Sequence, residues 1–317
     1  MLICPACRVL TDDGVSVHTI ERDGEALVCT NCARRYPIVA DIPIVVPDVG
    51  AFMRTESLAV LERDVSLDVA QLLVEQGADD APYARLLEHV SIYMDAHWGD
   101  HADPPVPLAC SAMLDKLQAL PRVASTVELG CSAGRVTATL AGLSEIVVGL
   151  DLQFATLRRA RRLLAGDPIA YARRTYGRYY APAVARGLAA TNVSLVCGDA
   201  LDPPLVPRMY DRVVALNLVD SVRSPGVLLD VLTGLCAFEG EVIVASPYAW
   251  QTGFVNDLER LGGRSPDNFV RDWFTARGYA VLDEADLPWS LRRDARSAVT
   301  YQIHYLRLRK PASQPTV

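Results

Sequence analysis

Four cysteines near the start of the sequence have the spacing of a metal site. Cys4 pairs with Cys7 and Cys29 with Cys32 in two Cys-x-x-Cys motifs, and 21 residues separate the motifs. Two such motifs can place four thiolates tetrahedrally around one zinc ion, and four thiolates make a structural site rather than one that activates water. Segment 1–48 is too short to bury its own core, so we expect zinc to stabilise it. Disulfides or redox dithiols are the alternative.

Acidic residues and glycines accompany three apolar runs farther along the chain. The run 123–130 contains Glu128 and ends in a Gly-x-x-x-Gly turn, Gly130 to Gly134, that opens a helical stretch. A second run ends in Asp151, 23 residues after Glu128. An acid at the end of the second strand of a Rossmann-like unit can accept both ribose hydroxyls. A third run, 193–197, leads to Asp199.

Strand-like runs alternate with helical stretches throughout this region. Two further runs, 211–218 and 241–246, follow the first three. This alternation predicts an α/β fold with a doubly wound sheet and ligands at the carboxyl ends of its strands. The alternating runs 279–282 and 299–306 are expected to complete a seven-stranded sheet with an antiparallel edge.

The glycine turn separates two classes of nucleotide ligand. A dinucleotide needs Gly-x-Gly-x-x-Gly at its pyrophosphate, whereas Ser132 stands at the second glycine position here. S-adenosylmethionine (SAM) has no pyrophosphate, and the motif set resembles the class I SAM-dependent methyltransferases. That resemblance implies that Glu128 contacts the methionine end and Asp199 the adenine amine. Taken singly, Asp199 could merely be a helix cap, and Asp151 could merely be the last residue of a strand. The expected cofactor-binding residues are Glu128, Gly130, Ser132, Gly134, Asp151, Leu152, Asp199, Ala200 and Asn217.

The N-terminal segment carries a second resemblance. The two cysteine motifs and the run Arg34-Arg35-Tyr36-Pro37-Ile38-Val39-Ala40-Asp41-Ile42-Pro43-Ile44-Val45 resemble the small zinc-ribbon adaptor that partners tRNA, rRNA and release-factor methyltransferases. This resemblance covers about residues 1–48. It implies an accessory domain of a methyltransferase and no particular reaction.

A third resemblance covers about residues 120–309. The runs 215–220, Ser246-Pro247-Tyr248-Ala249-Trp250, 261–263 and 286–296 resemble the methyltransferase domain of ovothiol synthase, which is similar to N-methyltransferases of thiol-bearing histidine. The resemblance implies an imidazole acceptor, although Ser297-Ala298 stands where a basic-aromatic pair is expected and the iron-dependent portion is missing. Asn217-Leu218-Val219-Asp220 lacks the Pro-Pro-aromatic motif of enzymes that methylate amide or exocyclic base nitrogens. The expected catalytic, substrate-side residues are Asp220, Tyr248, Trp250 and Arg296.

The segment between ribbon and sheet is predicted to be helical. Leucine and valine recur at helical spacing over 54–120, and Asp79-Asp80-Ala81-Pro82 is a helix-start signal. His97, His101 and Asp103 have the spacing of a two-His, one-carboxylate iron site. Gly99 and Pro104 interrupt the helix there, which argues against an iron site. The favoured alternative is that this helix packs over the cofactor cleft as a lid.

Arginines gather between the second and third predicted strands. Residues 158–186 contain eight arginines, one acid and four interleaved tyrosines, a local charge of +7. Arginine with aromatic residues can bind nucleic acid or phosphate. The alternatives are a clamp for an anionic small substrate and a solvated arginine-rich helix face.

The whole composition limits the classes of function. The 317 residues carry a net charge of −7, so the chain as a whole is not a polycationic nucleic-acid binder. No secretory signal or membrane-spanning run is visible, and a cytoplasmic location is expected. The predicted domains are a zinc ribbon (1–48), a helical linker or lid (49–109), a methyltransferase domain (110–309, insertion about 166–190) and a flexible tail (310–317).

Three functions remain open at this point. The first is SAM-dependent methylation of a small molecule, on nitrogen of an imidazole or amino-acid-derived metabolite. The second is rRNA or tRNA base methylation, with the ribbon and the arginine-rich insertion docking RNA. The third is a non-catalytic adaptor. The sequence does not decide whether the ribbon docks on its own chain or builds a homodimer.

Overall fold

A seven-stranded sheet forms the centre of the computed structural model, which describes residues 2–11, 14–251, 253 and 255–313. Its spatial order is β12-β9-β8-β13-β14-β16-β15, and every neighbouring pair is parallel except the two that involve β16. The strands in that order are β12 (Val193–Cys197), β9 (Ser144–Asp151), β8 (Val123–Leu129), β13 (Tyr210–Leu216), β14 (Cys236–Ser246), β16 (Ala298–Arg309) and β15 (Ala280–Arg292). The predicted α/β fold is confirmed, with one correction. The antiparallel strand, β16, is second from the edge of the sheet, because β15 lies outside it and forms the edge.

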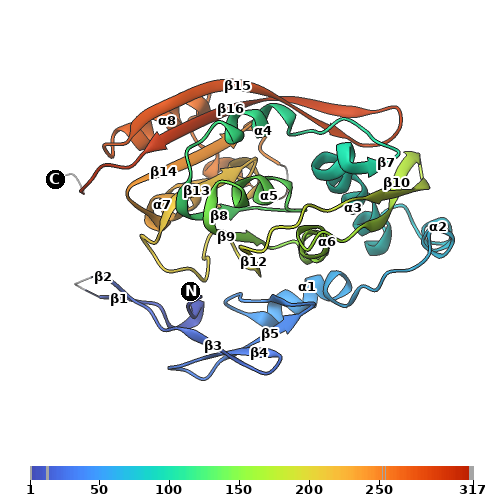
Figure 1. The fold of residues 1–317 in the computed structure, drawn as a ribbon, viewed down its shortest axis with the longest axis horizontal. Helices are drawn as coiled ribbons and strands as arrows, with labels where there is room; N and C mark the ends of the chain where they lie inside the picture. Colours follow the sequence, from blue (N-terminus) through green and yellow to red (C-terminus); the bar gives the residue numbers. More distant parts are fainter. Residues whose placement is uncertain (1, 12–13, 252, 254, 314–317) are drawn as a thin grey trace.

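Helices cover both faces of this sheet (Figure 1). Alternate strand residues point to opposite faces, as in any strand. Val213 and Val242 share one apolar cluster with α7 (Pro225–Leu235) and α8 (Pro266–Thr275). Val214 and Ile243 share another with α4 (Ser111–Gln118) and α5 (Arg135–Ala141), and α6 (Phe154–Leu164) packs on β12 on that side.

The N-terminal segment forms the predicted ribbon. A 3-10 turn (Pro5–Cys7) precedes the pair β1 (Val9–Thr11) and β2 (Gly14–Ser16). A four-stranded antiparallel sheet follows, made of β3 (Ile20–Asp23), β4 (Ala26–Cys29), β5 (Arg35–Val39) and β6 (Ile42–Pro43). Gly24 makes the turn between β3 and β4 with φ +60°, a conformation that glycine adopts without strain.

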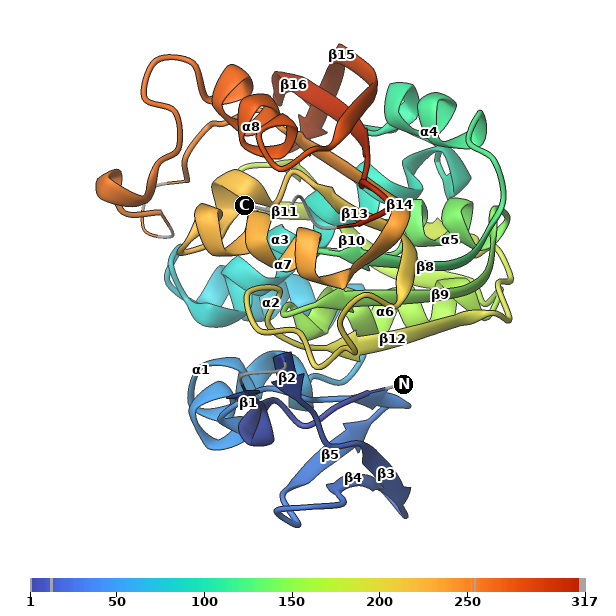
Figure 2. The ribbon, with the colours of Figure 1, turned by 90° about the vertical axis from the view of Figure 1, so that its left-hand side faces the viewer.

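The ribbon docks on its own chain, at the outer edge of β12 (Figures 1 and 2). The Val45 N–H donates to the Cys197 carbonyl at 2.8 Å, and Ile44 forms a parallel bridge with Cys197. The Ile3 N–H donates to the Pro204 carbonyl at 3.0 Å. These contacts satisfy an edge that would otherwise expose unpaired backbone groups.

Four helices lie between the ribbon and β8, and the first three of them form the predicted helical linker. These three are α1 (Val49–Leu61), α2 (Leu67–Gln76) and α3 (Pro82–Trp98), and a 3-10 turn (Gly99–His101) ends the last. The Asp48 and Ser66 side chains cap α1 and α2 by accepting backbone N–H bonds. Helix α3 begins at the predicted proline. No helix in the described part of the chain is long and apolar enough to cross a membrane.

The arginine-rich segment is only partly helical. Its first part belongs to α6, and its second part forms the hairpin of β10 (Ile169–Tyr176) and β11 (Tyr179–Ala185), extended by β7 (Ala102–Asp103). The hairpin coincides with the predicted insertion. It lies beside α3 (Figure 1).

Strands β15 and β16 make a hairpin that extends past the sheet toward α3 and β10 (Figure 1). Near its tip, the Ala295 N–H donates to the Thr175 carbonyl at 3.0 Å. At its side, Arg292 donates to Asp95 of α3 at 2.9 Å. The sequence predicted only the short runs 279–282 and 299–306, so it missed most of this hairpin. Within the predicted tail 310–317, residues 314–317 lie outside the described residues.

Candidate active site

A cavity of about 510 Å³ opens at the carboxyl ends of the parallel strands. This is where ligands bind in doubly wound sheets, and the volume is typical of a ligand site. It brings together eight of the nine predicted cofactor residues with one predicted catalytic residue. These are Glu128, Gly130, Ser132, Asp151, Leu152, Asp199, Ala200, Asn217 and Asp220.

The glycine turn shapes one wall of the cavity. Gly130 has φ +79°, and a Cβ there would come within 3.2 Å of Leu218. Gly134 has φ +80° and lies against Ala160 of α6, where a Cβ would approach to 3.0 Å. Gly134 is not among the lining residues of the cavity. The positive φ and the close approach of α6 explain why a glycine stands at position 134, and its contact with the cofactor stays a prediction.

Two carboxylates stand where the sequence expected the ends of strands. Asp151 accepts backbone N–H bonds from Ser132 at 2.7 Å and Gln153 at 2.8 Å. Asp199 accepts the Leu201 N–H at 2.8 Å and pairs with the Arg223 guanidinium at 2.8 Å. Each carboxylate is thereby held in a fixed orientation with lone pairs left for a ligand.

Four buried polar atoms on the cavity wall lack a hydrogen-bond partner among the described residues. They are Ser132 Oγ, Asn217 Oδ1, Asp220 Oδ1 and His97 Nδ1. Buried polar groups in folded proteins are nearly always paired. Their convergence on one cavity therefore fits a polar ligand that completes them, as SAM would with its amino acid and ribose groups.

Glu128 is buried beneath this wall. It accepts a hydrogen bond from Thr137 Oγ1 at 2.5 Å. Burial raises the pKa of Glu128 to about 8, so the carboxyl is mainly protonated at neutral pH before a ligand binds. A positively charged ligand nearby would favour the ionised form.

Helix α3 lines part of the cavity, as the lid alternative expected. His89, Tyr93 and His97 lie one turn apart on the same helix face, and all three line the cavity. Burial is the main cause that lowers the pKa of both histidines to about 4, so both imidazoles are neutral at pH 7. The Trp98 indole N–H donates to the Ala133 carbonyl at 2.7 Å and so ties α3 to the glycine turn.

The iron interpretation of this helix is not supported. Among the described residues, the only group of metal-ligating side chains that converges is the four cysteines. His97 faces the cavity, His101 lies 3.8 Å from Asp100, and Asp103 is part of β7. The break at Gly99 turns the three side chains away from a common centre.

Three of the four predicted catalytic residues lie outside the cavity lining. The Tyr248 hydroxyl forms a hydrogen bond with His304 Nδ1 at 3.0 Å, and the Trp250 ring lies 6.0 Å from the Tyr248 ring. Arg296 is exposed in the turn between β15 and β16. Backbone geometry explains the change, because Tyr248 and Trp250 have φ +51° and +42°, and Ala249 between them faces the cavity.

Residues that the sequence did not single out complete the wall. Trp289 and Leu291 of β15 and Tyr301 of β16 line the cavity from the long hairpin. Trp289 and Tyr301 are directly opposite each other in the strand register, which places their side chains on one face. The alternation of large apolar residues over 287–291 was the available signal.

Two family models match parts of the chain, and solved structures are similar to it. Residues 127–244 match the family model described as a methyltransferase domain, and residues 1–40 match the model described as a Trm112p-like protein. No curated protein matches the chain. Among solved structures, the chain is similar to an S-adenosylmethionine dependent methyltransferase from Mesorhizobium loti, with 16% identity over 64% of this chain and 98% of that chain and a TM-score of 0.42. It is also similar to the N-methyltransferase NodS from Bradyrhizobium japonicum, with 13% identity over 74% and 99% and a TM-score of 0.40.

The family match covers the end of β8, all of β9, β12 and β13, and most of β14, which are the parallel strands whose carboxyl ends meet at the cavity. The chain is thus an enzyme with a Rossmann-like methyltransferase domain. More particularly, it is a SAM-dependent methyltransferase with an N-terminal Trm112p-like segment. The expected resemblance to ovothiol synthase is not shown by these matches and stays a prediction.

Replacing Asp151 tests the ribose side of the cavity. We expect Asp151→Ala to weaken SAM binding at least about tenfold with the fold retained, because a hydrogen bond to a charged group contributes about 1.5–3 kcal/mol. Isothermal titration calorimetry measures the affinity. Glu145→Ala, on an exposed position of the same strand, is the matched control. An unchanged affinity for Asp151→Ala would refute the assignment.

The raised pKa of Glu128 predicts a pH dependence of SAM binding. The cationic ligand lowers this pKa, so binding releases a proton while Glu128 is protonated in the free enzyme. Affinity should therefore rise with pH, by up to about tenfold per unit, and level off above about pH 8. Titrations in buffers of different ionisation enthalpy report the released proton. Glu128→Gln should abolish that contribution, and an identical pH profile in this variant would contradict the assignment.

Proposed function

We propose that this enzyme transfers a methyl group from SAM to a nitrogen atom of a small molecule, an imidazole or amino-acid-derived metabolite. The observation that carries the proposal is the set of aromatic and imidazole rings in the cavity wall. His89 and Tyr93 of α3 and Trp289 and Tyr301 of the long hairpin face this cavity. Such a wall of rings suits a small ring or amine better than a polymer.

The residues of the cavity fit SAM. Glu128 and Asn217 would hold its amino acid end, Asp151 its ribose and Asp199 its adenine. When bound, SAM supplies an electrophilic methyl carbon that accepts the lone pair of the acceptor nitrogen as the sulfonium bond breaks. The chain itself positions the acceptor, and the two neutral imidazoles can accept hydrogen bonds from it without repelling a cation.

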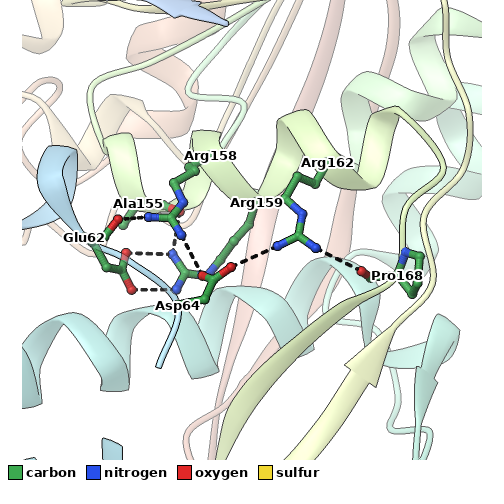
Figure 3. A network of polar contacts seen from close by, with 7 residues as sticks. All are labelled: Glu62, Asp64, Ala155, Arg158, Arg159, Arg162 and Pro168. Carbon is green, nitrogen blue, oxygen red and sulfur yellow. Dashed lines mark hydrogen bonds and ion pairs between the residues drawn. The ribbon is translucent and has the colours of Figure 1, made fainter. Parts of the chain in front are cut away.

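The RNA alternative depends on free positive charge in the arginine-rich segment. Seven of its eight arginines form ion pairs with acids from other elements, at Asp41, Glu62, Asp64, Asp79, Glu88 and Asp95. Figure 3 shows three of them, Arg158, Arg159 and Arg162, bound to Glu62 and Asp64. The eighth, Arg186, shares a surface hollow with Asp100 and Asp103. Six acids therefore face seven of these arginines, so most of the local charge of +7 is compensated, which favours the small molecule.

Methyl transfer from labelled SAM by the full-length protein tests the proposal. We expect label in small imidazole or amine acceptors and none in tRNA or rRNA. An inactive control is Asp151→Ala. RNA binding that weakens steeply with salt, together with label in RNA, would establish the alternative. SAM binding without transfer to any acceptor would favour an adaptor.

We further propose that the four cysteines hold a structural zinc ion. Their sulfur atoms lie within 4.8 Å of one another, with 3.7 Å between Cys7 and Cys29 and 3.9 Å between Cys4 and Cys32. A tetrahedron with Zn–S bonds of about 2.3 Å has edges of about 3.8 Å. The Asn31 and Cys32 N–H groups lie 3.4 and 3.5 Å from Cys29 Sγ and can stabilise its thiolate.

Losing this ion should also weaken SAM binding. The ribbon holds the loop that follows Asp199, because Arg8 donates to the Pro203 carbonyl at 2.7 Å and pairs with Asp202 at 2.9 Å. We expect Cys29→Ser to lose zinc, lower the melting temperature and reduce SAM affinity. Metal analysis and calorimetry measure these effects. Glu21→Ala, exposed in the same ribbon, should change none of them. Full SAM affinity in the zinc-free variant would disprove the coupling.

A further inference from the structure

The charges around the cavity point to the chemical class of the methyl acceptor. Four lining residues are acids, Glu128, Asp151, Asp199 and Asp220, and one is a permanent cation, Arg223. The Arg223 guanidinium lies 2.8 Å from Asp199 and is therefore already paired. The residues outside the described part of the chain include no lysine or arginine. The cavity therefore offers no unpaired permanent cation to an anionic acceptor.

Arginines just behind the wall are also engaged. Arg292 pairs with Asp95 at 2.9 Å, Arg135 with Asp100 at 2.9 Å and Arg159 with Glu62 at 2.8 Å. His89 and His97 are neutral at pH 7 because burial lowers their pKa values to about 4. On the acceptor side, away from the expected SAM contacts, an additional carboxylate or phosphate would be desolvated without a positive side chain to pair with, which is strongly unfavourable.

Asp220 is the acid that the expected SAM contacts leave free. Its side chain is 2% exposed. One oxygen accepts the Ala249 N–H at 2.9 Å, and the other has no partner among the described residues. A protonated amine or an imidazole N–H would satisfy this oxygen, whereas a second carboxylate would be repelled by it. Where the bound ammonium nitrogen is itself the acceptor, its proton passes to the Asp220 carboxylate, and the freed lone pair then attacks the methyl carbon.

Aromatic rings accompany Asp220 on the same wall. Tyr93, Trp289 and Tyr301 all line the cavity. Burial and then the charges of Asp151, Tyr301 and Asp220 raise the pKa of the Tyr93 phenol, so these groups lie close enough to interact. Aromatic faces attract cations as well as flat heterocycles.

We infer that the acceptor is a basic amine or imidazole without a carboxylate or phosphate, bound by Asp220 and by the rings of Tyr93, Trp289 and Tyr301. The inference rests on the proposed function of small-molecule N-methylation. It narrows the methyl acceptor to amines and imidazoles that carry no carboxylate or phosphate, and it excludes free amino acids. Arg296, where the sequence expected a substrate contact, lies in the hairpin turn and supplies no cation to the cavity.

Matched pairs of ligands test the inference on the full-length protein saturated with S-adenosylhomocysteine. Histamine against histidine and tyramine against tyrosine differ by one carboxylate. We expect calorimetry to show at least about tenfold tighter binding of the amine in at least one pair, and methyl transfer from SAM to follow the same preference. Asp220→Asn, which keeps the bond to Ala249, should remove most of that preference.

A second variant guards against misfolding of the first. Tyr301→Leu should weaken amine binding several-fold, whereas Tyr301→Phe, which keeps the ring, should restore it; Arg296→Ala is the control outside the cavity. Tighter binding of the carboxylated member, lost in Arg223→Ala, would overturn the inference and leave small-molecule methylation standing. Binding of neither member of either pair would overturn the inference, and label in RNA instead would also overturn the proposed function.

Discussion

The acceptor side of the cavity depends on one buried carboxylate. Asp95, in the last turn of α3, accepts hydrogen bonds from the Tyr171 hydroxyl at 2.6 Å, Arg173 Nε at 2.7 Å and Arg292 at 2.9 Å. These three donors come from β10 and from the tip of β15. Desolvating such a cluster is costly unless every partner is present, so α3, the insertion hairpin and the long hairpin are fixed together. The rings that face the acceptor stand on two of these three elements.

The parallel part of the sheet was readable from the sequence because its strands are buried on both faces. Such strands are nearly continuous apolar runs, and their ends place Glu128, Asp151 and Asp199 without knowledge of any other contact. This apolar pattern does not extend to the hairpin of β15 and β16, which projects past the sheet. Trp289 and Tyr301 reach the cavity only because β15 and β16 pair at 12 positions. The turn between these strands has no distinctive sequence, so their register cannot be predicted from a short segment.

The free charge of the arginine-rich segment was the property that the sequence predicted least well. Arg158 and Arg159 are separated from Glu62 and Asp64 by more than 90 residues, so a window over 158–186 counts the cations and misses their partners. Similarly, Tyr248 was expected at the reacting centre, yet its hydroxyl is used by His304, whose other nitrogen meets Glu284 at 2.9 Å. A residue type shows what a side chain can do, whereas its neighbours determine what it is free to do.

The position of the ribbon has a consequence for the order in which the chain folds. Val45 and Cys197, which meet at the docking edge, are 152 residues apart in sequence. At a synthesis rate of about 5–20 residues per second, roughly 8–30 s pass between the appearance of the two. During that interval the ribbon has no sheet to rest on. A metal-bound ribbon would stay folded during that interval. It would then present a preformed strand to β12, the outer parallel strand of the newly synthesised domain.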